Sequence, residues 1–99
     1  MSEPSDLWRL QQNAQFPPSC LERSVDGVRL VKVDAVAGAI LTASLRTDGM
    51  VRPINDARRR DLERHRILIG KALEDSALDA DSRAYFQRLA ILSDHVLKG

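Results

Sequence analysis

Apolar residues recur at intervals of three and four through the second half of the chain, and this spacing restricts that half to helices. In 56–76, Leu62, Ile69 and Leu73 share one stripe, because an α-helix turns by about 100° per residue. In 80–97 a wider apolar face is formed by Tyr85, Phe86, Leu89, Leu92, Val96 and Leu97. Two helices with so short a connection are expected to pack as antiparallel neighbours.

The first half of the chain contains two further helical patterns. A helix is predicted over 34–47, with Asp34 as its N-cap and Asp48-Gly49 at its end. A shorter one is predicted over 6–15, capped by Ser5 and stopped by Pro17-Pro18. A helix this short is marginal alone, so Trp8 and Leu10 are expected to pack on the rest of the chain.

The segment 21–33 has two interpretations. Asp26-Gly27 stands between two apolar stretches, which is typical of a two-residue β-hairpin. The alternation of side chains is poor, however, since the predicted register places Arg23 and Lys32 on the same face as Leu30. An extended arm laid on the helices is therefore preferred over the hairpin.

Together these patterns predict a mainly α fold in one small domain, 1–99, with a loose N-terminus at 1–5. Three main helices (34–47, 56–76 and 80–97) form a bundle, preceded by the short helix and by the arm or hairpin of 21–33. The chain of 99 residues is long enough for one modest core. Its predicted members are Ile40, Leu41, Leu45, Leu62, Ile69, Leu73, Phe86, Leu89, Leu92 and Val96.

Composition excludes several classes of protein. The hydrophobic fraction of 43% and the net charge of +1 do not fit a disordered chain. The longest apolar run, 35–45, is too short to span a membrane, and the acidic start lacks the apolar region of a signal peptide. The single cysteine, Cys20, cannot form an internal disulfide, and a cytoplasmic location is expected.

A cluster of cations in 52–71 is the strongest candidate for a functional surface. This segment has seven cations against three acids, a net charge of +4. Arg60, Arg64 and Lys71 fall opposite the apolar stripe, with Ile67 near them. The candidate contact residues for a protein partner or for phosphate are Arg58, Arg59, Arg60, Arg64 and Lys71. The alternative is a solvated face with internal pairs such as Asp56 with Arg60.

No constellation for catalysis or metal binding is recognisable. His65 and His95 have no cysteine or second histidine at ligand spacing, and His65 is expected to pair with Asp61 one turn earlier. Ser93-Asp94-His95 cannot form a catalytic relay, because consecutive helical residues point in different directions. No catalytic residue, metal site, cofactor or small-molecule substrate is therefore expected, and the chain is predicted not to be an enzyme.

Several short motifs support a resemblance. They are Pro17-Pro18-x-Cys20, Gly27-Val28-x-Leu30-Val31-x-x-Asp34, Ala37-Gly38, Tyr85-Phe86-x-Arg88-Leu89 and Val96-Leu97. Through them the chain resembles small bacterial proteins to which no activity is assigned. The resemblance spans most of 17–97, implies a bacterial cytosolic origin and carries over no functional residue.

Two functions follow as hypotheses. The first is a non-enzymatic protein–protein interaction or regulatory module, which binds a protein partner or associates with itself. The second is a nucleic-acid-binding protein that uses the arginine-rich helix. The acids within that helix and the sequence pI of about 8.0 favour the first.

Overall fold

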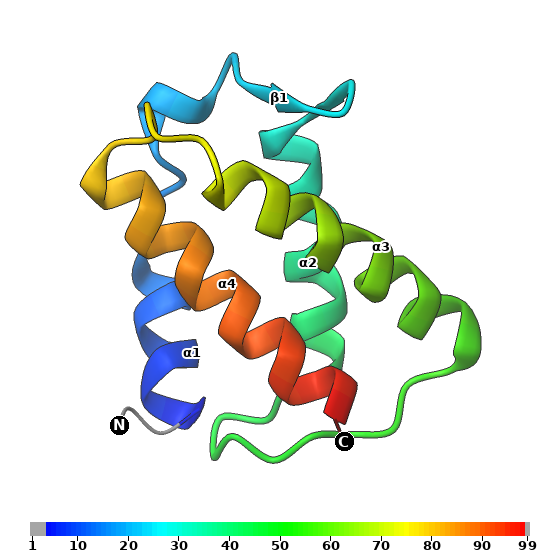
Figure 1. The fold of residues 1–99 in the computed structure, drawn as a ribbon. Coiled ribbons are helices and arrows are strands. Elements are labelled where there is room, and N and C mark those ends of the chain that lie inside the picture. The colour runs from blue at the N-terminus through cyan, green and yellow to red at the C-terminus, as the bar shows by residue number, and fades with distance from the viewer. Residues whose placement is uncertain (1–3, 99) are drawn as a thin grey trace.

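A computed structural model describes residues 4–98 (Figure 1). Its helices are α1 (Pro4–Asn13), the short 3-10 helix η1 (Pro18–Cys20), α2 (Leu30–Ser44), α3 (Asp56–Leu73) and α4 (Ala80–Lys98), and its strands are β1 (Ser24–Val25) and β2 (Val28–Arg29). The predicted mainly α bundle is confirmed. Within 4–98, no helix is long and apolar enough to cross a membrane.

The N-terminal helix α1 packs against α4, and the two run in opposite directions (Figure 1). Trp8 is buried, as expected, but Leu10 is 57% exposed, so its predicted packing is wrong. Ser5 is not the cap, because α1 already begins at Pro4, where proline fits the first helical turn. Ser5 therefore does not belong to the loose end predicted for 1–5, and residues 1–3 lie outside the described part.

The hairpin at 24–29 is formed, so the preference for an extended arm is wrong. Val25 pairs with Val28 and Ser24 with Arg29. Asp26 and Gly27 take φ values of 50° and 79°, as a tight hairpin turn requires. The strands have two residues each, and the poor alternation that argued against a hairpin therefore lies mostly outside them.

Helix α2 begins four residues before the predicted start. The hairpin supplies the reason, since the carbonyl of Arg23 accepts a hydrogen bond from the backbone N–H of Leu30 at 2.9 Å. No side-chain cap is made at Arg29, and Asp34, the predicted N-cap, lies inside the helix. Its side chain is consequently free for another partner.

Helix α2 also ends earlier than predicted, at Ser44. Leu45 is extended and pairs with Val51 in an antiparallel bridge. The chain reverses between them at Gly49, whose φ is +87°. A Cβ at Gly49 would lie 3.0 Å from the backbone nitrogen of Ser5, so any other residue there would crowd α1 as well as strain the turn.

Helices α3 and α4 run in opposite directions, as expected (Figure 1). Asn55 caps α3 by accepting a hydrogen bond from the backbone N–H of Arg58 at 2.8 Å. Asp79 precedes α4, and its carboxylate accepts hydrogen bonds from the hydroxyls of Ser82 and Ser19. These bonds lower the pKa of Asp79.

The buried apolar residues form one cluster between the helices. Nine of the ten predicted core residues are buried, and Leu73 is only partly buried at the end of α3. The side chains of Phe16, Tyr85 and Phe86 meet edge to face, with ring centroids 5.3 to 6.1 Å apart. Buried residues that the periodicity did not indicate include Cys20, Leu30, Val33, Leu68 and Leu78.

Candidate functional site

The structure divides the predicted cationic set. The exposed members are Arg58, Arg60, Arg64 and Lys71. Arg59 is different, because it is half-buried and its Nη1 donates a hydrogen bond to the carbonyl oxygen of Leu97 at 2.8 Å. It therefore joins α3 to the last turn of α4. Its positive charge there also interacts favourably with the negative end of the helix dipole.

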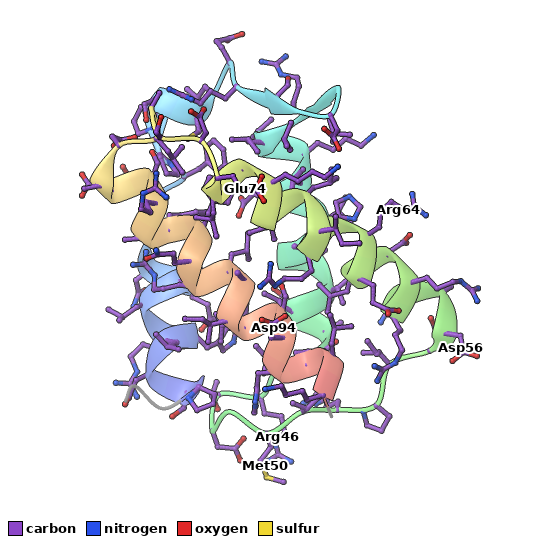
Figure 2. All side chains as sticks on the ribbon, in the orientation of Figure 1. Arg46, Met50, Asp56, Arg64, Glu74 and Asp94 are labelled. Carbon is purple, nitrogen blue, oxygen red and sulfur yellow. The ribbon has the colours of Figure 1, made fainter. Side chains whose placement is uncertain are left out.

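Arg66, which was not singled out, also joins α3 to α4. Its Nε and Nη2 donate to the two carboxylate oxygens of Asp94 at 2.8 and 3.1 Å. Figure 2 shows Asp94 on the face of α4 beside α3. This forked arrangement fixes the relative position of the two helices, and Arg66 is not available to an external ligand.

Two of the exposed cations have acidic neighbours. Lys71 forms an ion pair with Asp26 at the tip of the hairpin, and the hydrogen bond and charge of Asp26 raise the pKa of Lys71. Nη2 of Arg64 lies 3.6 Å from Oδ1 of Asp61. The Arg64 side chain nevertheless extends away from the body of the molecule (Figure 2). The expected pair of Asp56 with Arg60 is not among the ion pairs within 4–98.

The same side of α3 exposes an apolar side chain. Ile67 is 61% exposed, and it lies near Arg60, Arg64 and Lys71, as the helical spacing predicts. We name this side the α3 outer face and define it by Arg60, Glu63, Arg64, Ile67, Lys71 and Glu74, of which all are exposed. It combines an accessible hydrophobic centre with charged neighbours.

His65 is a buried structural residue. It is 8% exposed, and its Nδ1 lies 2.7 Å from the backbone oxygen of Asp61. The predicted pairing with Asp61 therefore occurs through the backbone and not through the carboxylate. Among residues 4–98, no group of three or more His, Cys, Asp or Glu side chains is placed to hold a metal ion.

A polar network between α1, α2 and α4 was not predicted. The hydroxyl of Tyr85 donates to Oδ1 of Asp34 at 2.7 Å, and Nε of Arg88 donates to Oε1 of Gln11 at 3.0 Å. Asp34 is half-buried and Gln11 is 6% exposed. The only signal in the sequence was a carboxylate inside the apolar stretch 30–45, which the N-cap interpretation of Asp34 concealed.

Two cavities adjoin this network. One, of about 550 Å³, lies between the end of α1 and the start of α4 and is lined by Pro17, Ser19, Asp81 and Arg88, among others. The second, of about 390 Å³, lies between α1, α2 and α4 and includes Asp34 in its lining. Tyr85 lines both cavities.

The burial of Asp34 predicts a pH effect on stability. Desolvation raises the pKa of Asp34 above 3.8, and the hydrogen bond from Tyr85 opposes this only in part. The pKa of Asp34 is 3.8 in the unfolded state and higher in the folded state. Between these two pH values the folded state binds more protons than the unfolded state. The free energy of unfolding therefore falls as the pH rises through this window.

Asp34→Asn should remove this effect while keeping an acceptor for Tyr85. We expect the stability of the variant relative to the wild type to increase as the pH rises through this window, measured by urea unfolding at a series of pH values. The stability of Asp79→Asn relative to the wild type should instead decrease as the pH rises toward 3.8, because the pKa of Asp79 is lowered from that value. If the free energies of unfolding of the wild type and of Asp34→Asn differ by the same amount at every pH, Asp34 has the same pKa in the folded and unfolded states, which contradicts the prediction.

Comparison with known proteins gives no matching family model, no matching curated protein and no matching solved structure. No relative therefore assigns a role to any of these side chains.

Proposed function

We propose that this chain is a non-enzymatic protein–protein interaction module that associates with a second copy of itself through the α3 outer face. The observation that carries the proposal is the exposure of Ile67, 61%, in the middle of a charged helix face. Burial of such a side chain at the centre of an interface stabilises a complex.

The charges around Ile67 support a second copy as the partner. By helical spacing, Arg60, Arg64 and Lys71 lie on one flank of Ile67, and Glu63 and Glu74 lie on the other. A two-fold axis parallel to α3 places the basic flank of each copy opposite the acidic flank of the other. The α3 outer face is therefore complementary to itself in charge.

Removing two cations should weaken this association. We expect the wild type to sediment as a dimer at high micromolar concentration and low salt, and Arg60→Ala with Arg64→Ala to shift it toward monomer. High salt should act in the same direction by screening. Stability should stay within about 0.5 kcal/mol, because exposed ion pairs contribute little.

A charge-matched control is available outside α3. Arg9 and Arg46 are exposed arginines in α1 and in the loop after α2, so Arg9→Ala with Arg46→Ala changes the net charge equally and should leave the dimer intact. A monomeric wild type at high micromolar concentration, or a dimer unaffected by the α3 double variant, would contradict the proposal.

Nucleic-acid binding is the alternative function. Arg58 and Arg60 support it, because neither forms an ion pair within 4–98 and both are therefore available to phosphate. Because Arg59 and Arg66 bind α4, three arginines of α3 stay available, and Lys71 is held by Asp26. With three phosphate contacts the logarithm of the affinity should fall with a slope of only about 3 against the logarithm of salt. Sedimentation with labelled duplex DNA distinguishes the two functions.

We further propose a bacterial cytoplasmic setting. Cys20 supports the cytoplasmic part, because this single thiol is free and completely buried, as is common for structural cysteines in a reducing compartment. The bacterial part rests on the resemblance of the short motifs in 17–97.

A further inference from the structure

The cavity of about 390 Å³ between α1, α2 and α4, which we name the Asp34 cavity, has the construction of a small-ligand site. Its apolar walls include Trp8, Gly38 and Leu89, and its polar groups include Gln11 and Asp34. Ligand sites of this volume combine apolar walls with a few polar groups that orient the ligand.

The first observation concerns the charge of the cavity. Asp34 is the one residue with a formal charge in the lining of the Asp34 cavity, and among residues 4–98 no cation forms an ion pair with it. Burial desolvates its carboxylate, and the single hydrogen bond from Tyr85 compensates only in part. Charges withdrawn from water are normally paired in proteins, so within the described residues this half-buried carboxylate lacks a cation.

The second observation concerns a hydrogen-bond donor. Nε2 of Gln11 is buried and has no hydrogen-bond partner within the described residues. Oε1 of the same amide accepts a hydrogen bond from Nε of Arg88 at 3.0 Å, and Gln11 and Tyr85 both line the cavity. The bond from Arg88 polarises the amide, which makes Nε2 a better donor.

We propose that the Asp34 cavity binds a small organic ammonium ion, whose N–H groups donate to Asp34 and whose hydroxyl oxygen accepts from Gln11. The indole of Trp8 and the ring of Tyr85 line the same cavity, and aromatic rings attract a cation through their faces. The ammonium ion supplies the charge that Asp34 lacks.

Fluorescence of Trp8 provides a direct measurement, because it is the single tryptophan of the chain and it lines the cavity. Three probes of similar shape separate charge from size: tyramine, a cation with a hydroxyl oxygen; tyrosol, its uncharged analogue; and phloretate, a carboxylate. Excitation at the red edge of the tryptophan band avoids the absorption of the probes. Amide resonances of Gly38 and of the Gln11 side chain map the site by NMR.

We expect saturable binding of tyramine in the millimolar range, with shifts at Gly38 and at the Gln11 amide, and no saturation with tyrosol or phloretate. Asp34→Asn should weaken tyramine binding by about tenfold or more, since the charge is lost. Asp81→Asn, in the neighbouring cavity, removes the same charge and should have no effect. Unfolding in urea verifies that both variants are folded.

Three results would overturn the proposal. Tyramine and tyrosol could bind equally, which would show a site without charge selectivity. The Trp8 fluorescence could fail to saturate with tyramine, or the amide resonance of Gly38 could fail to shift, which would show that tyramine does not bind in the cavity. Asp34→Asn and Asp81→Asn could weaken binding equally, which would assign the effect to net charge alone.

Discussion

Replacing Phe86 with alanine is expected to lower the free energy of unfolding by about 3–5 kcal/mol, the cost typical of a fully buried aromatic side chain. Phe86 is 0% exposed, and its ring contacts those of Phe16 and Tyr85 edge to face. The loss combines apolar burial, a cavity and two aromatic contacts. Equilibrium unfolding in urea measures it, with the slope of the transition checked for two-state behaviour.

Phe86→Leu is the matched control, because it keeps an apolar side chain at the same site. We expect it to lose clearly less stability than Phe86→Ala, since less volume is left empty. Equal losses in the two variants would mean that the aromatic contacts, and not the filled volume, account for the stability at this position. A loss below about 1 kcal/mol for Phe86→Ala would contradict its position in the core.

Ile69→Ala is expected to lower the free energy of unfolding by about 2–4 kcal/mol. Ile69 is 0% exposed on the inner side of α3, and Ile67, two residues earlier on the same helix, is 61% exposed. Ile67→Ala therefore makes the same chemical change at an exposed position, and we expect it to stay within about 0.5 kcal/mol. Urea unfolding at a concentration where the chain is monomeric compares the two.

The comparison tests the rotation of α3 about its own axis. Similar losses at both positions, or a larger loss at Ile67, would place the wrong side of α3 against the core. At high protein concentration Ile67→Ala should also weaken the proposed self-association, because Ile67 lies at its centre.

The helices could be predicted because their signals are local. The stripe of Leu62 and Ile69 faces the core, as spacing alone indicates. The turn at Asp26-Gly27 was also a correct local signal, but the alternation expected of long strands was applied to strands of two residues. That mistake shifted the expected start of α2 to Asp34.

The roles of individual charged residues could not be predicted, because their partners are distant in sequence. Asp34 binds Tyr85, 51 residues away, and Arg66 binds Asp94, 28 residues away. A helical wheel separates inner from outer positions, but it does not identify a side chain that reaches a neighbouring helix. Arg59 was grouped with the exposed cations for this reason, although it donates to the carbonyl of Leu97.

The packing of α1 on α4 imposes an order on the folding of the nascent chain. Gln11 and Arg88 are 77 residues apart, and α4 is the helix against which α1 makes most of its contacts. A domain emerges from the ribosome N-terminus first, so α1 is synthesised long before the surface that covers it. α1 therefore cannot pack on α4 until α4 has left the exit tunnel.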